Sequence, residues 1–382
     1  MERVAIIGIG LHPFGRTPGM SGLDQGVFAA RKALDDAGLK WSDIGIAFGG
    51  SRSSGHAMAA TNQLGLTGLP FINLYTGCAT GGSSLFAAAN AIKSGAAKYA
   101  MAIGFDKHER GAFSPSAKNN DIPSWVSETG LMVTTQFFAL KLQRYMHDYN
   151  ISHDTLVKVA EKAFKNGSLN PNAWRKSIVS YKEIAESKMI NDPLRKYMFC
   201  SPAEGGAALI LTSETEVRKM GVKAVFLEAT EMRTKNYGSF EVYDTYLAAN
   251  IQPTATSNAA KAAFESAGIG PDDIDVLQIQ DTEVGAEIMH LAENGFCKHG
   301  DQESLIQNGE TLISGRIPVN TDGGCIANGE PIGASGLRQV YEICLQLRGQ
   351  AGSRQVINSP KVGYTHVYGS PGVSAVNILA TS

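Results

Sequence analysis

The sequence predicts an α/β protein built by duplication of one helix–loop–strand unit. Residues 31–50 (RKALDDAGLKWSDIGIAFGG) and 261–280 (KAAFESAGIGPDDIDVLQIQ) share an amphipathic helix ending at Ala-Gly, a short loop with Asp-Ile, and a dense apolar run. Glycine commonly ends helices, and an apolar run without alternation indicates a strand buried on both faces. The offset of 230 residues, from 31 to 261, is too long for a solenoid repeat and indicates two homologous domains.

A second pair of similar segments supports the duplication. Residues 77–85 (GCATGGSSL) precede a helix expected at 85–95, and residues 323–336 (GGCIANGEPIGASG) precede a helix expected at 337–348. Each half thus presents a glycine-rich loop at a helix start. We expect the two loops to meet at the crevice between the halves, where open α/β sheets usually bind ligands.

An insertion interrupts this pattern. The sequence is therefore divided into an N-terminal half (1–106 plus 206–225), a loop or lid domain (107–205) and a C-terminal half (226–382). The basic residues of the insertion either face a phosphorylated ligand or lie on a solvated surface. They include Arg144, Arg175 and Arg195.

Composition narrows the class of protein. The 382 residues suffice for two or three domains, charged residues make up 18%, and the formal net charge is −2. This balance gives no electrostatic footprint for nucleic acid or an anionic membrane. The five cysteines are odd in number and widely spaced, which argues against disulfides and a structural metal. The apolar run at residues 4–10 is too short for a signal peptide, so a cytoplasmic location is expected.

Cys78 is the strongest catalytic candidate. It lies in a small-residue loop before an expected helix, where backbone N–H groups favour a thiolate and glycines leave room for a substrate carbonyl. The alternative is an inert, buried cysteine.

These residues resemble the thiolase superfamily over essentially the whole chain. The loop with Cys78, the segments beginning at Asp192, Cys200 and Pro318, and the closing run 362–376 all match. The sterol-carrier-protein type thiolases are the nearest branch, because His366 followed by Gly369 is similar to their His-Asn-x-Gly element. The resemblance implies a duplicated five-layered α-β-α-β-α thiolase fold with a loop domain, a homodimer, and coenzyme A as a substrate without a tightly bound cofactor or metal.

Two motifs depart from the family. Glu330 stands where members usually carry the histidine of Gly-His-Pro, and Gln280 and Asp281 replace a His-Asp or Asn-Glu pair. Such substituted members resemble the branch that works with a separate small zinc-ribbon and OB-fold subunit. That branch includes the thiolase acting on 2-benzoylsuccinyl-CoA and the steroid side-chain aldolases.

The departures raise the question of which group accepts the proton of Cys78. An ordinary thiol and glutamate differ by about four pKa units, so transfer to Glu330 would be uphill by roughly 6 kcal/mol. The corresponding gap to a histidine is about two units. We therefore predict His366 as the base and expect Glu330 either to orient His366 as a carboxylate or to donate to a thioester oxygen as a neutral acid.

The remaining site residues follow from the resemblance. Asp281 is a weaker catalytic candidate that alternatively caps a helix. Backbone N–H groups of Cys78 and Gly369 are expected to bind the oxyanion. The other candidates are Gln280 and Asn328 for the substrate, and Arg144, Arg175, Arg195 and Ser335 for coenzyme A.

Three functions remain open at this stage. The first is a thiolase that cleaves or forms a C–C bond in a bulky 3-ketoacyl-CoA, such as 2-benzoylsuccinyl-CoA, through a Cys78 acyl-enzyme. The second is a retro-aldol lyase acting on a 3-hydroxyacyl-CoA. The third is a non-catalytic, thiolase-like protein that binds lipids or acyl-CoA.

Overall fold

The computed structural model describes residues 2–241, 243, 252–370 and 372–381. Nine strands form one mixed sheet in the order β3-β2-β4-β7-β1-β8-β11-β10-β9. Its strands are β1 (Val4–Gly15), β2 (Ile46–Gly50), β3 (Phe71–Asn73), β4 (Tyr99–Lys107), β7 (Glu204–Ser213), β8 (Val225–Thr234), β9 (Val276–Ile279), β10 (Val362–Gly369) and β11 (Val373–Thr381).

The pairing directions repeat between the two halves. In the N-terminal half β2 and β4 are parallel, whereas the pairs β4/β7 and β7/β1 are antiparallel. In the C-terminal half β9 and β10 are parallel, whereas β10/β11 and β11/β8 are antiparallel. Antiparallel pairing of β1 with β8 joins the halves. The topology therefore has the internal symmetry expected of a duplication.

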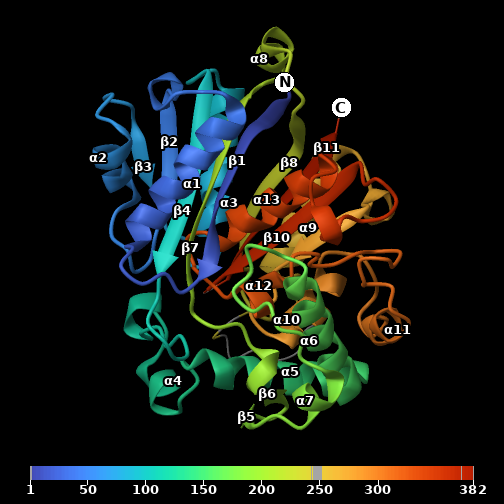
Figure 1. Cartoon of the computed structure of the whole chain (residues 1–382). Coiled ribbons are helices and arrows are strands. Elements are labelled where there is room, and N and C mark those ends of the chain that lie inside the picture. The colour runs from blue at the N-terminus through green and yellow to red at the C-terminus, as the bar shows by residue number, and fades with distance from the viewer. Residues whose placement is uncertain (1, 242, 244–251, 371, 382) are drawn as a thin grey trace.

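The fold has five layers, in which the two halves of this sheet alternate with three layers of helices (Figure 1). Helix α1 (Gly22–Ala37) packs on β1, β4 and β7, and α9 (Ala255–Ala267) packs on β8 and β11. Between the two halves lie α3 (Thr80–Lys93) and α13 (Ser335–Leu347), which contact each other and strands of both halves. The predicted five-layered α/β thiolase fold is confirmed.

Local sequence signals explain the matching helices. Ser21 caps the start of α1 and Thr254 caps the start of α9 through hydrogen bonds to backbone N–H groups. At the other ends, Gly38 and Gly268 adopt left-handed φ angles of 65° and 70°. These are the Ala-Gly ends of the repeated segments, and a left-handed residue at this position favours glycine.

The inserted segment forms a helical region below the sheet (Figure 1). It contains α4 (Ser124–Glu128), α5 (Thr134–Tyr149), α6 (His153–Ser168), α7 (Tyr181–Ala185), β5 (Met189–Asn191) and β6 (Leu194–Arg195). Helix α6 packs on α10 (Val284–Glu293), α11 (Gln302–Gln307) and α12 (Gly324–Asn328). The insertion thus shares an apolar core with the C-terminal half, while the predicted domain division stays a prediction.

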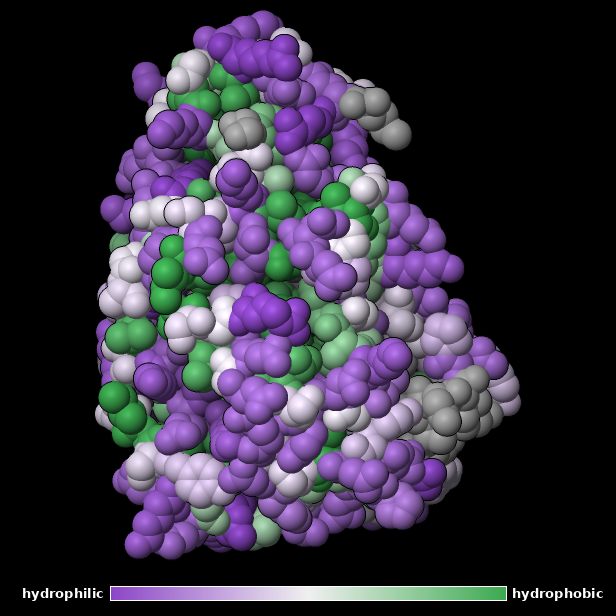
Figure 2. Space-filling view, turned by 90° about the vertical axis from the view of Figure 1, so that its right-hand side faces the viewer, coloured by the Kyte–Doolittle hydropathy of each residue, from purple (hydrophilic) through white to green (hydrophobic). Residues whose placement is uncertain are grey.

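The remaining helices are short and the surface is mixed. They are α2 (Thr61–Leu64) and α8 (Glu214–Met220). On the face in Figure 2, hydrophobic residues lie scattered among hydrophilic ones. In the part of the chain that the structure describes, no helix is long and apolar enough to cross a membrane.

The close approach of α3 and α13 depends on glycine. A Cβ atom at Gly336 would lie 2.9 Å from the backbone N of Gly82 and 3.2 Å from Val367 Cγ1. We expect Gly336→Ala to lower the free energy of unfolding by about 1–3 kcal/mol, because overpacking outweighs the higher helix propensity of alanine. Urea denaturation measures this loss. Gly270→Ala is the matched control, since its Cβ would have no neighbour closer than 3.9 Å; equal stability of the two variants would contradict the prediction.

Candidate active site

Cys78 lies on a tight turn at the start of α3. The N–H of Ala79 donates to Thr76 O (3.2 Å) and that of Thr80 to Gly77 O (3.0 Å), so the chain turns sharply just before the helix. Gly77 has a φ of 59°, a left-handed value that favours glycine. The sequence therefore places the thiol beside the positive end of the α3 dipole.

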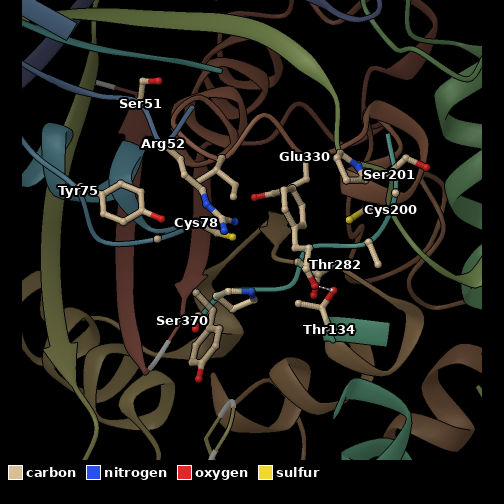
Figure 3. A pocket seen from close by; sticks show the side chains of 18 of the residues that line it. Ser51, Arg52, Tyr75, Cys78, Thr134, Cys200, Ser201, Thr282, Glu330 and Ser370 are labelled. Carbon is tan, nitrogen blue, oxygen red and sulfur yellow. Dashed lines mark hydrogen bonds between the residues drawn. The ribbon is translucent and has the colours of Figure 1, made fainter. Parts of the chain in front are cut away.

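The thiol opens into a large cavity between the halves (Figure 3). The cavity has a volume of about 940 Å³. Its wall includes Cys78 and Glu330 from the two glycine-rich loops, and Thr134, Phe138 and Phe199 from the insertion. The two loops that the sequence pairs by similarity therefore meet at one site, and the insertion supplies part of its wall.

Glu330 is the ionisable group beside Cys78. Its side chain is fully buried, and Cys78, Cys325 and Ser335 are within hydrogen-bonding reach of the carboxylate. Gln280 Nε2 lies 3.3 Å from its Oε2. The backbone of Glu330 is fixed by a hydrogen bond from its N–H to Ser201 O (2.9 Å). The replaced histidine position thus holds a carboxylate aimed at the nucleophile.

Burial shifts both members of this pair in the same direction. Burial and the nearby Glu330 carboxylate raise the pKa of the Cys78 thiol well above its ordinary value. Burial also raises the pKa of Glu330, although the hydrogen bonds from its neighbours oppose the rise. The nearby Arg52 guanidinium opposes the shift of the Cys78 pKa. The site consequently disfavours a second negative charge.

Gly369 packs directly against the Cys78 turn. A Cβ atom at Gly369 would clash with Thr76 O and would lie 2.9 Å from the N of Ala79. Gly77 likewise faces Ser370, whose backbone N and O would lie 3.1 and 2.8 Å from an added Cβ. The structure therefore places Gly369 beside Cys78, as an oxyanion role requires, and that role stays a prediction.

His366 lies on the face of β10 opposite to Val367 and does not line the cavity, so the structure does not support its predicted role as the base of Cys78. Its buried ring has Nε2 3.1 Å from Thr256 Oγ1 of α9, and its ring centroid is 4.5 Å from that of His290. The neighbouring Val367 packs instead on Ala79, beside Cys78. Side chains alternate along a strand, so a one-residue step reverses the face.

Asp281 and Asn328 hold the loops of the site rather than line the cavity. The buried Asp281 carboxylate accepts hydrogen bonds from the N–H groups of Cys325 (2.6 Å) and Ile326 (3.3 Å) at the start of α12. Asn328 Nδ2 donates to the carbonyl oxygens of Asp322 (3.0 Å) and Gly324 (2.7 Å). The catalytic role predicted for Asp281 and the substrate role predicted for Asn328 are therefore not supported.

The four predicted coenzyme A residues lie outside the cavity wall. Arg144 pairs with Asp148 on α5, and Arg195 donates to Ser187 O at 2.7 Å. Arg175 donates to Ile326 O (2.7 Å), Phe199 O (3.2 Å) and Ser201 Oγ, so it binds backbone within the fold. Ser335 is fully buried near Glu330. Sequence charge alone does not distinguish such structural arginines from ligand-binding ones.

Further side chains line the cavity, and two of them, Cys200 and Arg52, were not singled out from the sequence as parts of the site. Cys200 lies in the cavity wall, and burial and the Glu330 carboxylate raise its pKa well above the ordinary value. Arg52 and Lys196 also line the cavity. Tyr368 lines it as well, and its hydroxyl donates to Glu241 Oε2 at 2.6 Å. The position of Arg52 directly after the repeated strand, in the loop 51–54, is the signal that points to it.

The fold and the site together define a protein of the duplicated α/β class that carries a half-buried thiol at a helix start. Human "Sterol carrier protein 2" is 32% identical over 99% of this chain and 72% of its own length. "Acetyl-CoA acetyltransferase" of Methanothermobacter thermautotrophicus is 31% identical over the whole of both chains. The chain belongs to the thiolase superfamily, in its branch of sterol-carrier-protein type thiolases.

Further similarities agree with this assignment. The family "Thiolase C-terminal domain-like" matches residues 239–381. "Benzoylsuccinyl-CoA thiolase subunit BbsB" of Thauera aromatica is 28% identical over 96% of this chain and 95% of its own. A solved structure titled "Ltp2-ChsH2(DUF35) aldolase" has a TM-score of 0.87 at 24% identity, covering 99% of this chain and 98% of that chain. This last likeness concerns the fold.

The position of His366 predicts a role in stability. Burial, with His290 nearby, lowers its pKa well below the ordinary 6.5, so the folded state holds a neutral ring whereas the unfolded state protonates near 6.5. Below that pH the unfolded state binds more protons than the folded state. As the pH falls, His366 therefore lowers the free energy of unfolding by about 1.4 kcal/mol per pH unit, until the pH reaches the pKa of His366 in the folded state.

We expect His366→Asn to lower the free energy of unfolding at pH 8 and to flatten its decline between pH 6.5 and 5. Denaturant titrations across this pH range measure both effects. The turnover profile against pH should keep its shape. The prediction would be contradicted if the turnover of His366→Asn lost a pH-dependent step that the wild type shows while its free energy of unfolding kept the wild-type pH dependence.

Proposed function

We propose that the chain is an acyltransferase that cleaves or forms a C–C bond in a bulky 3-ketoacyl-CoA through an acyl-enzyme on Cys78. The observation that carries this proposal is the Cys78 thiol within hydrogen-bonding reach of the Glu330 carboxylate, at the start of α3 and in the wall of a 940 Å³ cavity. A covalent intermediate requires a nucleophile with a proton acceptor beside it.

Glu330 replaces His366 as the proposed proton acceptor. Proton transfer from thiol to carboxylate moves one negative charge within a single buried site and creates no new one. Burial raises the pKa values of both groups, so the penalties largely offset. The α3 terminus and Arg52 favour the charge on sulfur. These contributions narrow the gap of roughly 6 kcal/mol between an ordinary thiol and glutamate.

The steps of the proposed cleavage then balance. Cys78 Sγ attacks the 3-keto carbon while its proton passes to Glu330, and the C2–C3 bond breaks to leave a thioester on Cys78 and a coenzyme A enolate. Glu330 returns the proton to C2 of the enolate. The thiol of a second coenzyme A attacks the acyl-enzyme, and its proton passes through Glu330 to the departing Cys78 sulfur.

A partner subunit and a homodimer belong to this proposal. The relative from Thauera aromatica is named as a subunit, which supports a partner subunit for this chain, and the resemblance described above implies that this partner is a small zinc-ribbon and OB-fold protein. For the homodimer, β3 is an edge strand of the sheet with exposed apolar neighbours. An exposed apolar edge is suited to pairing with the same strand of a second copy.

Cys78 and Glu330 variants test the acyl-transfer mechanism. Cys78→Ala should abolish the acyl adduct detected by mass spectrometry after incubation with a 3-ketoacyl-CoA. Glu330→Gln should lower kcat/KM by roughly 10²- to 10⁴-fold, since general acid–base catalysis contributes about that factor. Cys200→Ser is the matched control, because it removes another cavity thiol near Glu330 and should keep the adduct.

The same experiment has a pH signature. Burial raises the pKa of Glu330 above 4.5, so wild-type kcat/KM should fall as the pH falls through that higher value, where a protonated carboxyl no longer accepts the thiol proton. Glu330→Gln should lack this acidic limb. An unchanged limb in the variant would refute the role of Glu330.

A retro-aldol lyase is the second candidate function, and one observation favours it. Tyr368 lines the cavity and donates a 2.6 Å hydrogen bond to Glu241, whose pKa burial raises to about 6. Tyr368 would accept the hydroxyl proton of a 3-hydroxyacyl-CoA while passing its own proton to Glu241. Turnover that survives Cys78→Ala and is lost in Tyr368→Phe would establish the lyase instead.

The β3 edge provides a separate prediction. Ile72 is 45% exposed on this strand, and Leu66 just before it is 83% exposed. Ile72→Lys should convert a dimer into a monomer, because a charge on the edge opposes strand pairing. Light scattering coupled to size-exclusion chromatography measures the mass. Ile357→Lys is the control, because Ile357 is an apolar residue that is 73% exposed away from β3, and this variant should leave the mass unchanged. A dimer in both variants would exclude β3 as the dimer interface.

A further inference from the structure

Arg52 projects into the cavity from the loop that follows β2, on the side of Cys78 (Figure 3). It is one of two lysine or arginine residues among the described residues of the cavity wall, and the other is Lys196. Its positive charge lowers the pKa values of Cys78, Tyr75 and Tyr243 against the effect of burial. The guanidinium group therefore lies near the nucleophile.

The backbone of Arg52 is held in place by the buried Asp106 carboxylate. Asp106 accepts hydrogen bonds from the N–H of Arg52 (3.0 Å), the N–H of Ser53 (2.7 Å) and the hydroxyl of Ser51 (2.9 Å). Gly333 N–H also donates to Asp106 at 2.8 Å. The Asp106 charge is thereby engaged with loop groups, and the loop that carries Arg52 has a defined position relative to Glu330.

Among the residues that the structure describes, the guanidinium group has no anionic partner. Across the described ranges, no carboxylate forms an ion pair with it, and its recorded contact is with the face of Phe113, 5.4 Å from the ring centroid. An arginine presents a planar set of donors that matches a carboxylate bidentately. Its position beside the reacting thiol leaves the complementary anion to the ligand.

We propose that Arg52 binds a free carboxylate on the acyl part of the substrate, close to the 3-keto carbon. The substrate class is then a 3-ketoacyl-CoA with a second, unesterified carboxylate. This inference rests on the proposed function and narrows its substrate. The phosphates of coenzyme A are the other possible anions, but they lie at the far end of the pantetheine arm, whereas Arg52 lies near Cys78.

The rest of the cavity wall fits the uncharged part of such a substrate. The aromatic side chains around Arg52 come from the N-terminal half and from the insertion, and they would contact an aryl or alkyl group. They are Tyr75, Phe113, Phe138 and Phe199.

The test compares two substrates that differ only in charge. One is 3-phenyl-3-ketopropanoyl-CoA with a carboxymethyl group at C2, and the other is its carboxamide. Wild-type kcat/KM should favour the carboxylate. Arg52→Gln should lower kcat/KM for the carboxylate roughly 10- to 100-fold more than for the amide, the range of a charged hydrogen bond, because the loss of the Arg52 charge near the Cys78 thiol affects both substrates equally. Arg52→Lys should fall between them, and Lys196→Gln should affect both substrates alike.

Two further measurements separate the alternatives. N-acetylcysteamine thioesters lack the phosphates, so an Arg52 effect that disappears with them would assign Arg52 to coenzyme A and overturn the proposal. An equal loss for carboxylate and amide would likewise overturn it, by assigning Arg52 to the thiolate.

Calorimetry on Cys78→Ala makes the result independent of turnover. The inference is supported if Cys78→Ala binds the carboxylate more tightly than the amide and if adding Arg52→Gln abolishes this difference. This result would hold even if no 3-ketoacyl-CoA is cleaved and the proposed reaction fails. Equal binding of the carboxylate and the amide by Cys78→Ala, with or without Arg52→Gln, would refute the inference.

Discussion

The Asp106 carboxylate at the end of β4 is the constraint on which the geometry of the site depends. It is fully buried, and its oxygens accept from the loop 51–53 of the N-terminal half and from Gly333 of the C-terminal half. His108 adds a second link through Nε2, which accepts from the N–H of Ile332 at 3.2 Å. Buried charges persist where hydrogen bonds satisfy them, so this cluster joins the two halves and fixes the segment after Glu330.

The contact of Cys78 with Glu330 follows from that link. Glycines let α13 approach α3 closely, and the segment 329–333 lies against residues 201–203, just before β7, and against Gly50 and Phe105. The duplication thus has a chemical consequence: the proposed nucleophile comes from one half and its proposed proton acceptor from the equivalent place in the other. Neither half contains the pair alone.

The sequence was sufficient to predict the fold, the duplication and the meeting of the two glycine-rich loops. These features rest on local signals, namely apolar runs, helix-ending glycines and N-cap residues, which tertiary contacts reinforce. The role of His366 was not predictable in this way, because it depends on which face of β10 the ring occupies. Val367, the residue after His366, is the one whose side chain points toward the Cys78 turn. Because side chains alternate along a strand, His366 points to the other face.

The arginines are a second case in which the sequence does not show which side chains face the cavity. Arg175 and Arg52 are both basic residues in loops, yet Arg175 is satisfied by carbonyl oxygens and a hydroxyl within the fold, whereas the structure gives Arg52 no anionic partner in the ranges it describes. Only the path of the backbone determines which of them faces the cavity. A charge becomes informative about ligands once the acceptors that surround it are known.

The electrostatics of the cavity connect the proposed reaction with the proposed substrate. Glu330 and the thiols of Cys78, Cys200 and Cys325 share one buried region in which each negative charge raises the pKa values of its neighbours. In the proposed reaction this region holds one negative charge, which moves between the Cys78 sulfur and the Glu330 carboxylate. A substrate that brings its own carboxylate would add a second charge there and be repelled. On the proposed assignment Arg52 offsets that penalty, because its guanidinium group lies on the Cys78 side of the cavity and, among the described residues, forms no ion pair with Asp106. The proposal therefore relates Glu330, which stands where family members usually carry a histidine, to Arg52: the carboxylate would add negative charge to the site, and the guanidinium group would allow the site to accept an anionic substrate.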